Sequence, residues 1–187
     1  MLTAIVDYSS GNLPSARKAF ETISVSKTLG SVVVTSNPDV ISSADRLVLP
    51  GDGAFPSCKT ELLSSEAYDA MVYAAMEKGR PFLGICVGMQ LMAIKGYEYE
   101  EIDGLGWIDG EVCKINPTDK NLKIPHMGWN TLNIEGEHPV LKGIFTGDHV
   151  YFVHSFHMVV GNRDQRLAYT DYGTDITAVV GTENLLG

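Results

Sequence analysis

The chain of 187 residues is 44% hydrophobic and 20% charged, which is the balance of a globular domain and excludes a mainly disordered chain. Its net charge of −9 disfavours nucleic acids and anionic membranes as partners, because binding to both begins with basic side chains that neutralise phosphates. No apolar run approaches the roughly 20 residues that span a bilayer, and the first residues lack the basic start of a signal peptide. The three cysteines form no C-x-x-C pair, so we expect neither a disulfide framework nor a zinc site, and a reducing cytoplasm is the simplest setting.

In chain order, the first half alternates apolar runs of strand length with segments of helical spacing. The three consecutive valines at 32–34 and the Pro50-Gly51 stop after 46–49 are typical strand signals. We predict strands at residues 2–7, 31–35, 46–49 and 81–85, and helices at about 14–23, 66–78 and 87–94. Such alternation indicates a mainly parallel sheet with helices on both faces.

The second half has a different texture, with short strands punctuated by glycine. We expect these strands at residues 107–115, 129–134, 149–156, 166–170 and 177–181. They are interpreted as antiparallel additions on or beside the parallel core. Since no repeat, low-complexity segment or linker interrupts the sequence, we expect a single domain over residues 1–187 with a three-layer α/β fold.

The most informative segment is residues 84–90, Gly-Ile-Cys-Val-Gly-Met-Gln, which joins a predicted strand to a predicted helix. Glycines two residues before and after Cys86 match the nucleophile elbow, a tight and strained turn with no room for side chains. The sulfur would lie at the carboxyl edge of the sheet, where open α/β sheets bind ligands, and a helix N-terminus would lower the pKa of the thiol. We predict that Cys86 is a nucleophile, whereas Cys58 and Cys113 are expected to be packing or surface residues.

A second glycine-rich loop, Gly51-Asp52-Gly53, follows the predicted strand at 46–49. Acyl transfer needs backbone N–H groups aimed at a developing oxyanion, and glycines allow the backbone angles that present them. We therefore predict an oxyanion hole formed by Gly51, Asp52, Gly53 and the N–H of Val87, the residue after the nucleophile. The carboxylate of Asp52 either disfavours the thiolate through like-charge repulsion or points into water.

Together these motifs resemble the class-I glutamine amidotransferases, over essentially the whole chain. P-G-x-G-x-F at 50–55 and G-I-C-x-G-M-Q at 84–90 are typical of that class. P-H-M-G-W-N at 125–130 and Y-F-V-H-S-F at 151–156 are similar to the glutaminase subunits of imidazole glycerol phosphate synthases, as is D-Y-x-x-G-N at 7–12. The resemblance implies a flavodoxin-like amidotransferase fold with a central, mainly parallel sheet and additional antiparallel strands.

The resemblance implies that the Cys86 thiolate attacks the side-chain amide of glutamine, releases ammonia and forms a glutamyl thioester that is hydrolysed to glutamate. The ammonia would pass through a barrel-shaped cyclase subunit to a nucleotide-derived substrate in histidine biosynthesis, with no metal or organic cofactor. By the same pattern, five residues bind glutamine, namely Gln90, Glu98, His154, Ser155 and Phe156. Simple solvation of Gln90 and a shift of the Glu98 assignment by one position remain alternatives, and Phe156 stands where a tyrosine is often expected.

A heterodimer with the cyclase is also implied, and the oxyanion loop would be productive only when the cyclase and its ligand are bound. Indole and amide groups at a polar interface are typical of a partner-facing motif, although core packing would also explain Trp129. The residues expected to face the partner are Asn12, Pro125, His126, Met127, Gly128, Trp129 and Asn130.

The sequence departs from the family at the general base. The family places a histidine in a His-Pro-Glu motif near the C-terminus, where the Glu orients the His, and residues 1–187 contain no such motif. We expect a chain that ends at Gly187 to hydrolyse glutamine poorly. Without the resemblance, His154 or His157 would be chosen as the base, but the family uses the region around His154 for substrate contacts.

Two other functions compete with this interpretation. A glutaminase of another pathway, such as pyridoxal phosphate or purine synthesis, is disfavoured by the P-H-M-G-W-N motif. A catalytically inactive or truncated amidotransferase-like binding subunit is favoured by the missing His-Pro-Glu motif and disfavoured by the intact cysteine elbow.

Overall fold

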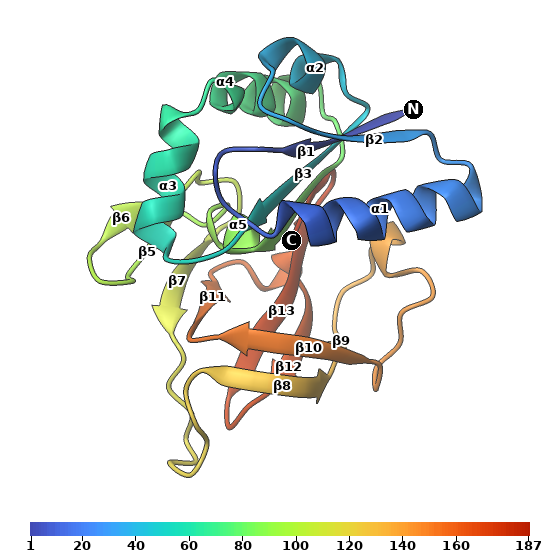
Figure 1. Ribbon diagram of the computed structural model, residues 1–187. Coiled ribbons are helices and arrows are strands. Elements are labelled where there is room, and N and C mark those ends of the chain that lie inside the picture. Colours follow the sequence, from blue (N-terminus) through green and yellow to red (C-terminus); the bar gives the residue numbers. More distant parts are fainter. The chain divides into compact units, whose positions relative to one another are not determined.

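The computed structural model describes residues 1–187, which form two compact units (Figure 1). The first unit comprises Met1–Leu91 together with Glu183–Gly187, and the second comprises Met92–Thr182. No helix has both the length and the apolar character needed to cross a membrane.

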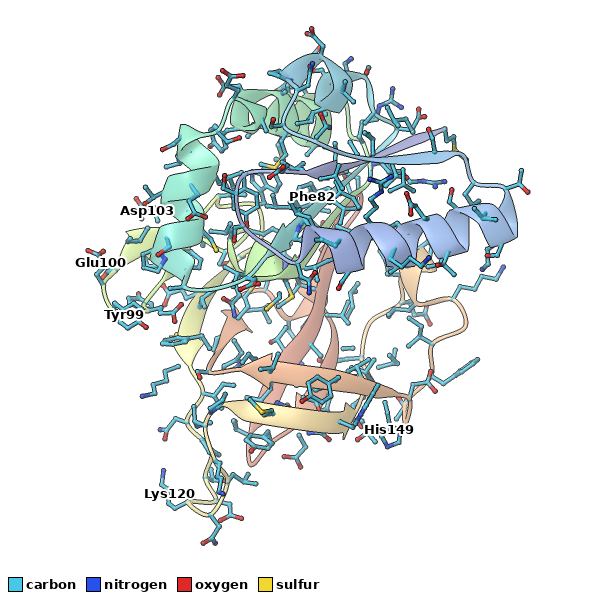
Figure 2. The ribbon with its side chains drawn as sticks, viewed as in Figure 1. Phe82, Tyr99, Glu100, Asp103, Lys120 and His149 are labelled. Carbon is cyan, nitrogen blue, oxygen red and sulfur yellow. The ribbon has the colours of Figure 1, made fainter.

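The first unit is built on five parallel strands in the order β2-β1-β3-β4-β14. The strands are β1 (Leu2–Val6), β2 (Ser31–Thr35), β3 (Arg46–Gly51), β4 (Phe82–Cys86) and β14 (Leu185–Leu186). Helix α1 lies on one side of β1 and β3, and α2 and α4 lie on the other (Figure 1). The core lies between these layers, where Ile5, Leu49 and Phe82 have at most 1% exposure, and Figure 2 shows Phe82 among the strands.

The helices of the first unit begin at capping residues that the sequence supplies. Asn37 caps α2 by accepting the N–H of Asp39 at 2.9 Å, and Pro38 occupies the first turn, where its missing N–H has no cost. The helices are α1 (Leu13–Lys27), α2 (Pro38–Ser43), α3 (Phe55–Ser64), α4 (Ala67–Val72), the π-helical turn η1 (Tyr73–Glu77) and α5 (Val87–Gln90).

The predicted parallel core is confirmed, with differences in its helices. All four strands predicted for the first half are present, and α1 runs four residues further than expected. The helix expected over 87–94 ends at Gln90, because the chain there enters the second unit through a series of turns. The helices α2 and α3 were not predicted. Both have prolines in their first turns, which a reading of proline as a stop signal misses.

The second unit consists mainly of antiparallel strands in three groups. Their orders are β11-β7-β5-β6, β13-β12-β9 and the pair β10-β8, and only β5 and β7 pair in parallel. The strands are β5 (Lys95–Gly96), β6 (Ile102–Asp103), β7 (Gly110–Lys114), β8 (His126–Thr131), β9 (Asn133–Ile134), β10 (His149–His154), β11 (Phe156–Val160), β12 (Arg166–Asp171) and β13 (Asp175–Thr182). Two short 3₁₀ turns, η2 (Pro139–Leu141) and η3 (Arg163–Gln165), complete it.

The predicted strands of the second half are therefore present, with bounds shifted by a few residues. The hairpin of β5 and β6 was not predicted, since each strand has only two residues. Figure 2 shows Tyr99, Glu100 and Asp103 at this hairpin and Lys120 at the tip of a separate loop.

Candidate active site

Cys86 is the last residue of β4 and immediately precedes α5. Its backbone has φ 57° and ψ −117°, a conformation that residues other than glycine rarely adopt. The residue is exposed at the carboxyl end of its strand. Gly51, at the end of β3, is the register partner of Cys86. The nucleophile and the predicted oxyanion loop therefore meet at one edge of the parallel sheet.

The glycines of the elbow are required by close approach of backbone to backbone. A Cβ added to Gly88 would lie 1.9 Å from the carbonyl oxygen of Leu49, and one added to Gly84 would lie 2.6 Å from that of Gly88. A Cβ on Gly51 would lie 2.5 Å from the Gly88 nitrogen. The predicted need for glycine on both sides of the nucleophile is confirmed, and it extends to the facing strand.

The environment of Cys86 raises the pKa of its thiol. Desolvation by the surrounding protein contributes most, the Val87 N–H lowers the pKa by hydrogen bonding to the sulfur, and the Asp52 carboxylate raises it. The lowering of the pKa expected at the helix N-terminus is present in the hydrogen bond from Val87, but desolvation outweighs it and the net pKa is raised. The four residues of α5 form a short helix, and desolvation outweighs the bond from Val87. Like-charge repulsion from Asp52 is confirmed, although this residue is also exposed.

The backbone of Asp52 is held by Ser10, a side chain with 8% exposure. The Ser10 hydroxyl donates to the Asp52 carbonyl at 2.9 Å, and the Asp52 N–H approaches the same Oγ at 3.3 Å. The buried Cys58 thiol also donates to the Asp52 carbonyl at 3.3 Å. One of the predicted oxyanion donors is thus engaged by Ser10, whereas Gly53, at φ 102°, has open space around it.

Ser10 is a supporting residue that sequence reasoning missed. It lies inside the D-Y-x-x-G-N motif, and Gly11 of that motif has φ 90° with no room for a Cβ beside Pro50, at 2.8 Å. The motif therefore packs against the oxyanion loop. Ser10 and Asp52 are 42 positions apart, so no local pattern reveals their contact. The one signal in the sequence was the D-Y-x-x-G-N motif itself, which contains this serine.

The predicted glutamine-binding residues lie in both units. Gln90 ends α5 with 6% exposure, so its simple solvation is excluded. Glu98 is partly exposed in the turn between β5 and β6. Ser155 is the single residue between β10 and β11, and its carbonyl accepts the Ile115 N–H at 2.9 Å. The binding roles of these residues stay predictions.

Most residues predicted to face a partner lie on the ribbon of β8 and β10, whose side chains alternate between two faces. Met127 and Trp129 are 60% and 70% exposed, and opposite them Val153 and Tyr151 are each 56% exposed. The Trp129 and Tyr151 rings meet edge to face at 5.6 Å. These four side chains form an apolar outer face, and core packing of Trp129 is excluded.

The other predicted partner-facing residues differ in exposure. Pro125 is exposed, Gly128 and Asn130 are partly exposed, and His126 is buried on the inner face of the ribbon. Asn12 is exposed and caps α1, since its Oδ1 accepts the Ser15 N–H at 3.2 Å. A structural role therefore accounts for Asn12 besides the predicted interface.

Histidines gather on the inner face of the ribbon. His126 Nδ1 lies 3.0 Å from His154 Nε2, and His154 Nδ1 lies 3.0 Å from the Phe156 carbonyl oxygen. Burial lowers the pKa of His126, of His154 and of His157, which lies on β11. The pKa falls to about 4 for His126 and for His157. Both ring nitrogens of His154 are occupied, which argues against a role for His154 as general base.

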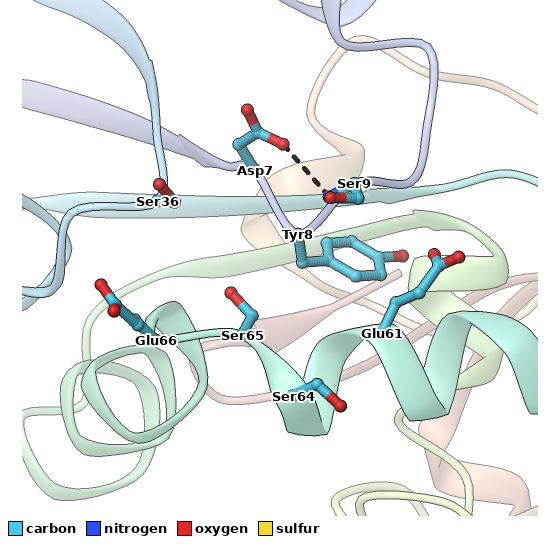
Figure 3. Close-up of a pocket in the computed structure, with 8 residues that line it drawn as sticks. All are labelled: Asp7, Tyr8, Ser9, Ser36, Glu61, Ser64, Ser65 and Glu66. Carbon is cyan, nitrogen blue, oxygen red and sulfur yellow. Dashed lines mark hydrogen bonds between the residues drawn. The ribbon is translucent and has the colours of Figure 1, made fainter.

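A separate groove of about 410 Å³ opens at the carboxyl ends of β1 and β2 (Figure 3). Its lining residues are Asp7, Tyr8, Ser9, Ser36, Glu61, Ser64, Ser65 and Glu66. Three carboxylates in a groove lined otherwise mainly by serines disfavour an anionic ligand. Residues 1–187 contain no group of three or more His, Cys, Asp or Glu side chains arranged to hold a metal ion.

Comparison with known proteins identifies this arrangement. Residues 8–185 match the family model of class-I glutamine amidotransferases, so the chain belongs to that family. Within it, the chain is 60% identical to the imidazole glycerol phosphate synthase subunit HisH of Ruegeria pomeroyi and 54% identical to that of Cereibacter sphaeroides. Both matches cover 100% of this chain and 89% of the relative. The resemblance found in the sequence is thereby confirmed.

Solved structures support the fold. A crystal structure of a glutamine amidotransferase matches with a TM-score of 0.70 at 16% identity, covering 98% of this chain and 86% of that one. A glutamine amidotransferase from Thermotoga maritima matches with a TM-score of 0.65 at 15% identity, covering 100% of this chain and 74% of that one. The predicted α/β amidotransferase fold, with a mainly parallel central sheet and added antiparallel strands, is confirmed.

Proposed function

We propose that this protein is the glutaminase subunit of an imidazole glycerol phosphate synthase, acting in the cytoplasm in histidine biosynthesis. The observation that carries the proposal is the backbone of Cys86, a positive-φ residue at the tip of β4 among glycines that no side chain could replace. Backbone strain of this kind is retained where it serves function. Identity of 54–60% to HisH subunits supports the choice of pathway.

The proposed reaction is acyl transfer through sulfur. The Cys86 thiolate attacks the amide carbon of the glutamine side chain, and the resulting oxyanion receives N–H bonds from Val87 and the loop of Gly51, Asp52 and Gly53. The C–N bond breaks as the leaving nitrogen takes a proton and departs as ammonia. Water then cleaves the thioester, which returns the thiol and releases glutamate.

Substrate binding is assigned residue by residue from the resemblance. Gln90, Glu98 and the backbone of His154, Ser155 and Phe156 are proposed to bind the polar groups of glutamine. The base that accepts the thiol proton belongs to the His-Pro-Glu motif of the family. The engagement of both nitrogens of His154 supports this assignment.

The proposed partner is a cyclase subunit that receives the ammonia. The apolar outer face of Met127, Trp129, Tyr151 and Val153 supports its docking at β8 and β10, because aromatic side chains and Met are enriched in the cores of interfaces. The hydrogen bond of the Asp52 N–H to Ser10 supports an oxyanion loop that becomes productive on partner binding.

A glutamine-mimicking diazoketone tests the proposal, with the cyclase and its ligand present. We expect alkylation of Cys86, located by peptide mass, together with release of glutamate from glutamine in a protein that carries the His-Pro-Glu motif. The Cys86→Ser variant is the matched control and should lose both. Absence of labelling and of turnover in the unmodified protein would instead indicate a catalytically inactive binding protein.

A further inference from the structure

The two inner-face histidines of the ribbon have only one arrangement of protons that fits their contacts. The Phe156 carbonyl can only accept, so His154 Nδ1 carries the hydrogen of their 3.0 Å contact. In the neutral ring, His154 Nε2 is then an acceptor, and His126 Nδ1 must donate to it. His126 Nε2 is left as an acceptor in turn.

Asn130 supplies the donor that this last nitrogen requires. Its Nδ2 lies 3.4 Å from His126 Nε2 and donates to the Asp171 carbonyl at 2.9 Å, while its Oδ1 accepts the Thr131 N–H at 2.8 Å. The hydrogen bonds that link Asn130, His126, His154 and the Phe156 carbonyl are thus all donated in the direction of Phe156. We call Asn130, His126 and His154, with the Phe156 carbonyl, the histidine chain.

The central ring of the histidine chain is fixed by packing as well as by hydrogen bonds. His126 has 2% exposure and stacks with Phe152 at 4.7 Å and with Tyr172 at 4.0 Å between ring centroids. The Tyr172 hydroxyl donates to the Lys123 carbonyl at 2.8 Å, which holds that ring in place. A protonated His126 or His154 would set two N–H groups against each other, in agreement with their lowered pKa values.

We propose that His126 and His154 are positioning residues whose tautomer-locked chain fixes the Ser155–Phe156 corner relative to β8, the strand that carries Met127 and Trp129. Ser155 is the only residue between β10 and β11, which belong to different groups of strands, so the chain changes from one group to the other at this corner. The histidine chain joins the inner face of the ribbon of β8 and β10 to the Ser155–Phe156 corner. This inference rests on the proposed function, because that function makes the corner a substrate contact.

Tautomers are measured on the unmodified protein by long-range ¹H–¹⁵N correlation spectra of its histidines at neutral pH. Both His126 and His154 should be neutral with hydrogen on Nδ1, the less common form of a free histidine side chain. Hydrogen on Nε2 of either ring would overturn the inference. This measurement needs neither partner nor turnover, so it remains decisive if the proposed function fails.

Two substitutions then separate hydrogen bonding from packing. The His126→Phe variant keeps an aromatic ring beside Phe152 and Tyr172 but cannot donate to His154, whereas the His126→Asn variant can place an amide donor near the position of Nδ1. We expect His126→Phe to raise the KM for glutamine about tenfold with a smaller change in kcat, and His126→Asn to recover part of that loss. A tenfold change corresponds to about 1.4 kcal/mol, the range of one hydrogen bond.

His149→Phe is the matched control, because His149 lies exposed at the opposite end of β10 and outside the histidine chain (Figure 2). It should leave the KM and the tautomers of His126 and His154 unchanged. An unchanged KM in a folded His126→Phe variant would overturn the inference. If the unmodified protein shows no turnover with the cyclase, the proposed function fails, and glutamine affinity measured by calorimetry replaces the KM.

Discussion

The turn around Cys86 requires glycines, because it has no room for side chains. The ribbon of β8 and β10 depends instead on side chains that alternate between its two faces. At the elbow, a Cβ on Gly51, Gly84 or Gly88 would lie within 2.6 Å of backbone atoms. In the ribbon, neighbouring residues such as His126 and Met127 go from 2% to 60% exposure. The elbow therefore tolerates no addition, while the ribbon depends on which face each side chain occupies.

The largest effect is expected at Gly88, where the elbow has no room for a side chain. Gly88→Ala would place a methyl group 1.9 Å from the Leu49 carbonyl oxygen, and the nearest atoms all belong to the backbone of Leu49 and Pro50, which cannot move aside as a side chain could. We expect the free energy of unfolding to fall by about 3 kcal/mol or more, measured by urea denaturation. Loss of Cys86 reactivity toward the diazoketone should accompany it, because the elbow has to open.

Gly79→Ala is the control for Gly88→Ala. Gly79 also lies in the first unit and has φ 60°, but no atom lies near the position of its Cβ. Only the left-handed backbone of the alanine is unfavourable, and we expect a cost of about 1–2 kcal/mol. Equal costs for the two variants would contradict the close-packing account of the elbow.

In the ribbon, loss of the Trp129 side chain is expected to weaken partner binding and to leave stability nearly unchanged. Trp129→Ala removes a side chain that is 70% exposed, so we expect the free energy of unfolding to change by less than about 0.5 kcal/mol. Affinity for the cyclase should fall by about 2 kcal/mol, roughly thirtyfold, measured by calorimetry. Tyr99→Ala, which removes an aromatic ring with 89% exposure on the β5–β6 hairpin, is the control and should retain affinity. Unaltered affinity in Trp129→Ala would exclude the outer face as the docking site.

The sequence predicts the elbow well because glycine spacing encodes a short-range constraint. Gly84, Cys86 and Gly88 are close in the chain, and the strand before them is unmistakably apolar. The length of α5 was overestimated, since the apolar spacing that continues to Ile94 belongs to turns rather than to a helix. The net rise of the thiol pKa was missed as well, because desolvation depends on atoms brought together by folding.

For the ribbon, the motif predicts which residues matter but not which face each one occupies. The P-H-M-G-W-N motif predicts one partner-facing block, yet His126 is buried and Met127 is exposed. Strand alternation separates these two residues only with the observed bounds of 126–131, because the predicted strand at 129–134 includes neither of them. The contact of His126 with His154 spans 28 positions and has no local signal.

Ser10 offers a smaller test of the elbow, because it restrains the oxyanion loop from outside. Ser10→Ala removes the hydroxyl that contacts both backbone groups of Asp52, at a cost of about 1 kcal/mol in stability. With the Asp52 N–H released, we expect the partner-free glutaminase rate to rise and the stimulation by the cyclase to fall. Ser9→Ala, on an exposed neighbour, is the control. Unchanged stimulation in Ser10→Ala would show that Ser10 does not restrain the loop.

The smallest effect is expected at Asp52, whose charge acts on the elbow without touching its packing. The carboxylate raises the pKa of the Cys86 thiol by repelling the thiolate, so Asp52→Asn should lower that pKa. The midpoint of the pH dependence of Cys86 alkylation by iodoacetamide, followed by peptide mass, should therefore move to lower pH. The shift is limited because desolvation, the largest cause of the raised pKa, is unaffected by the substitution.

Salt separates this charge effect from a change in structure. Raising the ionic strength screens an exposed carboxylate, so the difference in midpoint between Asp52→Asn and the unmodified protein should shrink. Asp39→Asn removes the same charge from an exposed position in α2 and should leave the midpoint where it was. If Asp52→Asn leaves the midpoint unchanged at low salt, the reactivity of Cys86 is set by desolvation and the Val87 N–H alone.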